Sequence, residues 1–170
     1  MNKGKYVFTQ VMGFVPRQVF QRLVKKHDGD YRVRGFNCTN QLRYMLSGQL
    51  TSCESLRDIS LCLNASSEIL YGLEITAAVN ESTLSRVNEN SNCRIYEGLG
   101  MALMKTVQPL YSKTKIGYIV PQDYELFALN STTISCGVKL MAWALGKYGR
   151  GAVKMHTLID LRGSIPSSST

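Results

Sequence analysis

Residues 92–111 read NCRIYEGLGMALMKTVQPLY, and this stretch divides the chain into two regions of different character. Apolar side chains recur at helical spacing through Ile95, Leu99, Leu103 and Val107. A stripe of this kind predicts a long amphipathic helix. It is the strongest helical signal in the chain, and it closes a region that is helical in pattern throughout.

The sequence before this stretch predicts further helices. One is expected over residues 16–27, and a second over residues 40–50 with Thr39 as its cap. A third should begin at Thr51 and Glu54, which have the spacing of a capping box. The second and third helices would form an αα-hairpin or a helix-turn-helix. Two shorter helical segments are expected at residues 68–73 and from Asn80 or Ser82 through Val87.

Beyond residue 115 the helical period ends and β-favouring residues become frequent. Strands are expected over residues 124–134 and 152–161, with a glycine-rich basic connector between them. Residues 167–170 are expected to form an unstructured tail. The sequence therefore predicts an α+β chain, with a helical domain at 1–115 and a β-rich region at 116–170.

The balance of charge favours a polyanionic partner. The chain of 170 residues carries a formal net charge of +8, with a pI near 9.4. Such a surplus of lysine and arginine points first to nucleic acid, although it can equally serve solubility. Residues 1–60 hold much of this surplus, as do residues 139–170.

Several classes of protein do not fit the sequence. The five cysteines include no Cys-x-x-Cys pair, and with only two histidines they suggest neither a disulfide framework nor a zinc knuckle. No apolar run is long enough for a membrane span, and the N-terminus lacks the apolar core of a signal peptide. We therefore expect a cytoplasmic protein with no membrane partner.

The residues alone do not indicate a catalytic set. His156 and Asp160 would share one face of the second strand, without an obvious nucleophile beside them. Without a nucleophile, His156 and Asp160 are better explained as strand residues that pair across a sheet.

Two runs in the β-rich region, with Trp143-Ala144 between them, resemble the start of a DDE-class insertion-sequence transposase. They are FALNSTTI at 127–134 and GAVKMHTLIDLRG at 151–163. Earlier segments resemble the helical domain that precedes the catalytic domain in these proteins: NKGKYVF at 2–8, YRVR at 31–34, QLT at 49–51, ESLRDI at 54–59, STL at 82–84 and NEN at 88–90.

The resemblance implies a ribonuclease-H-like domain in which three acidic residues bind two divalent ions, usually magnesium. The first acidic residue would stand just before Ser-Thr-Thr, where this chain has Asn130. Asparagine lacks the negative charge of aspartate, so this first catalytic position is degenerate. The other two acidic residues would lie beyond residues 165–166. We therefore expect an incomplete ribonuclease-H-like sheet of marginal stability, a truncated and inactive transposase, and no bound metal or cofactor.

What should remain is DNA binding. The side chains expected to contact DNA phosphates are Arg57, Arg86, Lys147, Arg150 and Lys154, together with the other lysines and arginines of residues 1–60. The expected partners are the DNA ends of the element, with a full-length transposase or a second copy of the chain. The alternative hypothesis is a small helix-turn-helix-type DNA-binding or regulatory protein without catalytic activity. A weaker alternative is a complete enzyme that uses Asn130 or His156 in another way.

Overall fold

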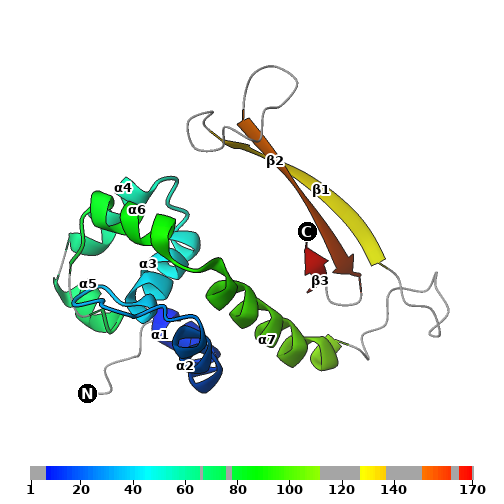
Figure 1. Cartoon of the computed structure of the whole chain (residues 1–170), viewed down its shortest axis with the longest axis horizontal. Coiled ribbons are helices and arrows are strands. Elements are labelled where there is room, and N and C mark those ends of the chain that lie inside the picture. Colours follow the sequence, from blue (N-terminus) through cyan, green and yellow to red (C-terminus); the bar gives the residue numbers. More distant parts are fainter. Residues whose placement is uncertain are drawn as a thin grey trace. The chain divides into compact units, whose positions relative to one another are not determined.

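The chain divides into two compact units in its computed structural model, Met1–Ala102 and Leu103–Thr170. The structure describes residues 7–65, 67–75, 78–111, 127–136, 151–161 and 165–169. Within these ranges the first unit is helical and the second contains a small antiparallel sheet (Figure 1). This confirms the α+β class expected from the sequence.

The described residues form seven α-helices. They are α1 (Val7–Gly13), α2 (Arg17–Lys26), α3 (Cys38–Leu50), α4 (Leu56–Asn64), α5 (Ser67–Gly72), α6 (Glu81–Asn90) and α7 (Cys93–Tyr111). The predicted helices are present, and α6 continues three residues past its expected end at Val87. The short α1 was not predicted. The division between the two units falls inside α7. Among the described helices, none is both long and apolar enough to cross a membrane.

The start of α3 differs from the prediction. Asn37, and not Thr39, caps this helix, because the Asn37 side chain accepts a hydrogen bond from the Asn40 backbone N–H at 2.9 Å. The helix begins at Cys38, so Thr39 lies within its first turn. Asparagine and threonine both serve as N-caps, and the sequence alone did not separate the two positions.

The capping box expected at Thr51 and Glu54 is also wrong. Ser55 caps α4, accepting a hydrogen bond from the Asp58 backbone N–H at 3.1 Å. Thr51 instead ends α3, where its hydroxyl donates to the Ser47 carbonyl at 2.7 Å. A threonine at this junction can satisfy a carbonyl at the end of one helix or an N–H at the start of the next, and here it does the former.

The core of the helical unit is built around Tyr44, whose side chain is fully buried. Its ring meets Phe36 edge-on, with 5.2 Å between the ring centroids. The Tyr44 hydroxyl donates to Asn64 Oδ1 and accepts from the Val79 N–H, both at 3.1 Å. The other buried members of this cluster are Ile59, Leu63, Ile75 and Leu84. A single polar atom in an apolar cluster thus has both of its hydrogen bonds satisfied.

Replacing Tyr44 by phenylalanine should destabilise the helical unit by roughly 1–3 kcal/mol, because it leaves the Val79 N–H and Asn64 without this buried partner. Urea unfolding followed by circular dichroism measures the change. Tyr71→Phe is the matched control, since the Tyr71 side chain is 87% exposed. Equal midpoints for the two variants would contradict the role given to the Tyr44 hydroxyl.

The close approach of α3 and α4 depends on Gly48. A Cβ atom at this position would lie 2.4 Å from Cδ1 of the buried Ile59. Only a residue without a side chain allows this contact, so the glycine sets how closely the two helices pack.

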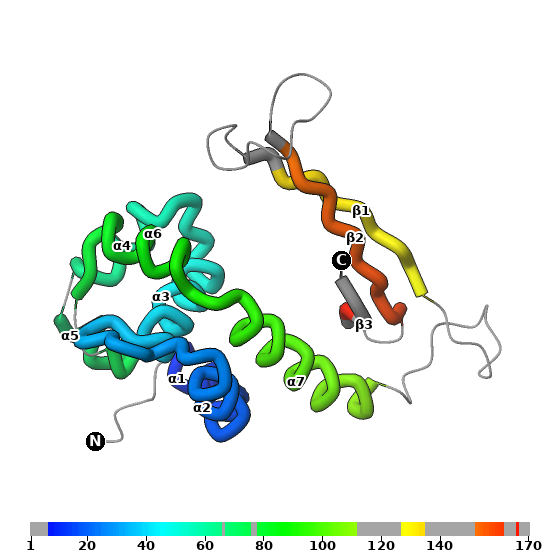
Figure 2. The backbone as a smooth tube through the Cα atoms, viewed as in Figure 1, coloured from blue at the N-terminus to red at the C-terminus, as the bar shows by residue number. Residues whose placement is uncertain are grey.

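Three strands form the sheet of the second unit: β1 (Phe127–Cys136), β2 (Gly151–Asp160) and β3 (Ile165–Ser169). They are antiparallel in the order β1-β2-β3, and β1 and β2 run side by side along their length (Figure 2). Asn130 pairs with Thr157 in this register.

The unstructured tail expected over residues 167–170 is wrong for its first three residues, which belong to β3. Ser168 pairs with Leu158, and Ser169 pairs with Thr157. Serines carry neither an apolar alternation nor a strong strand preference, so the pairing with β2 has no local signal in the sequence.

Candidate nucleic-acid interface

The residues predicted to bind DNA lie in both units. Arg57 is exposed in the first turn of α4, and Arg86 is exposed in α6. Lys154 is exposed in β2. Lys147 and Arg150 lie outside the described residues. Of the three that are described, Arg86 lines a pocket together with residues of the loop after α2.

This loop turns sharply at the end of α2. Asp28 adopts a left-handed backbone conformation with φ of 51°, and the Gly29 N–H donates to the Val24 carbonyl at 2.9 Å. A Cβ atom on Gly29 would lie only 2.5 Å from Cδ1 of Ile95 in α7. The absence of a side chain therefore lets the loop pack directly against the buried start of α7.

The carboxylate of Asp30 fixes the remainder of this loop in place. Asp30 Oδ1 accepts a hydrogen bond from the Cys38 backbone N–H at 2.7 Å. The Asp30 backbone carbonyl accepts from the Val33 N–H at 3.2 Å. Between these fixed points Tyr31 and Arg32 are exposed, and the Arg32 guanidinium lies 5.1 Å from the centre of the Tyr31 ring. The loop is thus a folded support for an aromatic and a cationic side chain.

A pocket of about 340 Å³ lies between this loop and the C-terminal half of α6. Its apolar lining includes Phe36, Cys38 and Val87, which are buried or half-buried. Its other lining residues are His27, Asp28, Gly29, Tyr31, Val33, Arg86, Asn90, Ser91 and Asn92. The pocket therefore combines an apolar interior with polar side chains contributed by two separate segments.

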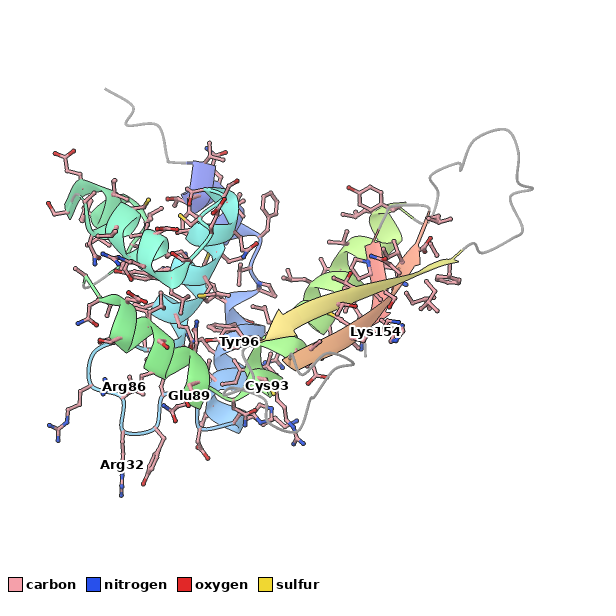
Figure 3. All side chains as sticks on the ribbon, turned by 90° about the horizontal axis from the view of Figure 1, so that it is seen from above. Arg32, Arg86, Glu89, Cys93, Tyr96 and Lys154 are labelled. Atoms are coloured by element: carbon pink, nitrogen blue, oxygen red, sulfur yellow. The ribbon has the colours of Figure 1, made fainter. Side chains whose placement is uncertain are left out.

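Two cations project from the same face of the helical unit as this pocket. Arg86 lines it, and Figure 3 shows Arg32 and Arg86 pointing outward on the same side. Glu89 follows Arg86 by one helical turn, and Asp28 lines the pocket, so the local charge is mixed. From the sequence, Arg32 was expected only as one of the cations of residues 1–60 and was not singled out. The turn at Asp28 and Gly29 was the only local feature of the sequence that could have indicated the position of Arg32.

Arg43 shows the contrasting case of a cation used within the fold. It donates to the backbone carbonyl and the carboxylate of Glu74 and has a side chain only 13% exposed. Arg17 also approaches this carboxylate, at 3.7 Å. Net charge alone therefore overstates the number of cations that face a ligand.

A buried polar network fixes the end of α6. The Gln41 side chain donates to Asn88 Oδ1 at 2.6 Å. The side-chain oxygen of Gln41, Oε1, accepts from the Ser91 hydroxyl at 2.7 Å and from the Tyr96 hydroxyl at 2.5 Å. Burial raises the pKa of Tyr96, with the neighbouring Cys38 adding to the shift, so this hydroxyl stays protonated as a donor. The network joins α3, α6 and α7 at the C-terminal end of α6, the helix that carries Arg86.

The thiol of Cys38 should react far more slowly than the exposed thiols of Cys62 and Cys93. Burial, and then the hydrogen bond and charge of Asp30, raise its pKa to about 12, so little of it is thiolate at neutral pH. Alkylation with iodoacetamide, followed by peptide mass spectrometry, compares the three sites. We expect protection of Cys38 in the native protein and equal labelling in urea. Rapid native labelling of Cys38 would contradict its placement in the pocket interior.

The surroundings of Asn130 do not fit the two cations that the resemblance implies. Asn130 is exposed on β1, its register partner is Thr157, and the next pair is Ser131 with His156. Asp160 lies three positions from Thr157, which places it on the opposite face of the sheet. No three His, Cys, Asp or Glu side chains gather as a metal site within the described ranges. Paired divalent ions need several anionic oxygens, which this part of the sheet does not provide.

Comparison with protein families matched residues 3–75, less than half of the chain, to a domain of unknown function, DUF4372. This domain is found in transposase-like proteins. The matched segment includes the loop after α2 and the α3–α4 pair. Comparisons with curated proteins and with solved structures returned no significant match.

Proposed function

We propose that this chain is a DNA-binding protein of the insertion-sequence transposase type and that its helical unit holds the DNA. The observation that carries the proposal is the placement of Arg32 and Arg86, which are far apart in sequence, on one face. Guanidinium groups bind phosphate oxygens in a planar, two-pronged geometry, and two of them on one face suit a backbone with repeated charges.

Two further observations support the transposase type. The family match covers the loop that carries Arg32, and the domain occurs in transposase-like proteins. In the second unit, β1 carries the run Asn130-Ser131-Thr132-Thr133, and it pairs antiparallel with β2. We propose that β1, β2 and β3 are the opening strands of a ribonuclease-H-like sheet.

The proposed activity is binding without cleavage. The neutral amide of Asn130 replaces the first metal-binding carboxylate expected of the family, and no carboxylate shares its face on the paired part of β1 and β2. The partners we propose are the DNA ends of a mobile element and a second transposase chain, either full-length or identical. Lys154 is a further phosphate contact in this proposal.

A second candidate is a small helix-turn-helix-type regulatory protein that reads DNA with α4. The α3–α4 pair, joined by the short Thr51–Ser55 junction, favours it. The exposed side of α4 presents Arg57 together with Leu61 and Cys62, so it offers one cation for phosphates. An Arg57→Gln variant separates the candidates: a large loss of binding favours α4, and a small loss favours the face with Arg86.

The test is fluorescence anisotropy with the full chain and labelled duplexes of about 30 base pairs, long enough for several phosphate contacts. One duplex carries DNA that flanks the gene, and the other carries random sequence of the same composition. We expect affinity to fall with salt, with a log–log slope of about −3 for three or four phosphate contacts. We also expect tighter binding to the flanking DNA. Salt-independent or undetectable binding at low salt would overturn the proposal, and magnesium-dependent nicking would overturn the absence of cleavage.

A further inference from the structure

Phosphate binding at Arg32 and Arg86 leaves the pocket beside them unused. Its volume of about 340 Å³ is at the lower end of the range for small-molecule sites, roughly 300–1,000 Å³. A helix or strand of a partner protein would not fit inside it, but a single ring with a short attached group would.

The interior of the pocket suits a flat aromatic ring. Phe36 lines it and is 9% exposed, and its ring is held by the edge-on contact with Tyr44. Tyr31 also lines the pocket, from the opposite end of the loop, and its side chain is 68% exposed. Phe36 therefore forms part of the apolar wall, and the accessible Tyr31 ring is the surface against which an aromatic ligand can stack.

The remaining pocket residues bring hydrogen-bonding groups and charges of both signs, since Arg86 is a cation and Asp28 is a carboxylate that a bound phosphate must avoid. Asn90 and Asn92 bring carboxamides to the pocket. Asn90 Nδ2 already donates to the Arg86 carbonyl at 2.7 Å, and Asn92 Oδ1 already accepts from the Arg94 N–H at 3.1 Å. Each amide keeps a further donor and acceptor position for the edge of a nucleobase. Arg86 brings a guanidinium to the same pocket, and Arg32 projects from the same face. Ring surfaces, amides and a guanidinium together match the parts of a nucleotide.

From this juxtaposition we infer that the pocket accepts one unpaired nucleotide of a DNA strand. Its base lies among Tyr31, Phe36 and the asparagines, and its phosphate lies at Arg86. The bases of an intact duplex are stacked and paired, so only a base that has left the stack can place its ring in the pocket. The inference rests on the proposed function, and it adds a preference for DNA ends or distortions with an unpaired base. A free mononucleotide has the same chemistry and is a separate arm of the test.

The experiment compares three labelled probes with the full chain: a blunt duplex of about 20 base pairs, the same duplex with a short 3′ overhang, and that overhang without bases. We expect the overhang to bind roughly tenfold more tightly than the blunt duplex, from stacking of one base. The abasic overhang should lose this gain. With 2-aminopurine in the overhang, binding should quench its fluorescence. Deoxyadenosine monophosphate should compete only at far higher concentration, since it lacks neighbouring phosphates; competition at equal concentration would point to a free-nucleotide site and overturn the inference.

Matched variants show which residues cause the preference for the overhang. Asn90→Ala should remove the preference for the overhang while blunt-duplex affinity changes less than twofold. Tyr31→Ala should also remove the preference, and its overhang affinity is compared with its own blunt-duplex affinity because it takes away the ring beside the Arg32 guanidinium. Tyr31→Phe should retain the preference. Gln49→Ala, an exposed amide that does not line the pocket, should change neither. Equal, salt-dependent binding of all three probes would overturn the nucleotide pocket and leave the proposed function standing. Failure to bind any of the three would overturn both.

Discussion

We expect the replacement of Arg32 and Arg86 together by glutamine to lower the proposed affinity for duplex DNA roughly 10- to 100-fold at low salt, which corresponds to about 0.7–1.4 kcal/mol for each of two exposed hydrogen-bonding contacts. The slope of log affinity against log salt becomes shallower by about 2, since each lost phosphate contact removes about 0.9. Both residues are exposed, so folding should be unaffected. Anisotropy titrations between about 50 and 200 mM salt measure the two quantities, and unfolding midpoints check stability.

Two control variants distinguish this face from general charge. Arg22→Gln removes an exposed cation of α2 that does not line the pocket, and its affinity should change less than twofold. Glu89→Gln removes a carboxylate one turn from Arg86, and binding should become tighter because a repulsive charge is gone. An equal loss from Arg22→Gln and from either single arginine variant of this face would show that DNA responds only to net charge.

Replacing Gln41 by leucine should destabilise the helical unit by about 2–6 kcal/mol. The substitution leaves two buried or half-buried groups, Asn88 Oδ1 and the Tyr96 hydroxyl, without their Gln41 partner, at roughly 1–3 kcal/mol each. Ser91 retains its hydrogen bond to the Val87 carbonyl. Urea unfolding of the full chain, followed by circular dichroism, measures the loss.

The matched control is Gln49→Leu in the same helix, where the side chain is exposed. It should change stability by less than about 0.5 kcal/mol. A partial destabilisation by Gln41→Leu should also weaken DNA binding, because the network fixes the end of α6 that carries Arg86. If Gln41→Leu left stability unchanged, the network would contribute little, and the leucine side chain would pack in this position as well as the glutamine does.

Periodic apolar residues were sufficient to predict most of the helices. Ile95 and Leu99 belong to the predicted apolar stripe and are buried. The helix ends were less predictable, because a capping side chain such as Thr51 has partners on either side of a junction. Strand β3 has no apolar alternation and exists through pairing with β2, which is a non-local contact.

The candidate site was predicted only in part. Arg86 stood out because a polar helix exposes it, and it does line the pocket. Arg32 was expected only as one of the cations of residues 1–60 and was not singled out. Its position depends on a turn at Asp28, on the missing side chain of Gly29 and on the Asp30 hydrogen bond to α3. None of these has a periodic signal, since loop geometry follows from contacts with elements distant in sequence.

The tight contact at Gly48 also limits how the helical unit can change in evolution. Helix preference alone would favour alanine there, by roughly 0.5–1 kcal/mol. The first added methyl group would nonetheless meet Ile59 at 2.4 Å. A library of all substitutions, selected for folded protein, should therefore retain glycine at this position, and only a smaller residue at position 59 should open it to alanine. Positions 48 and 59 are therefore coupled: which residues are permitted at one depends on the residue at the other.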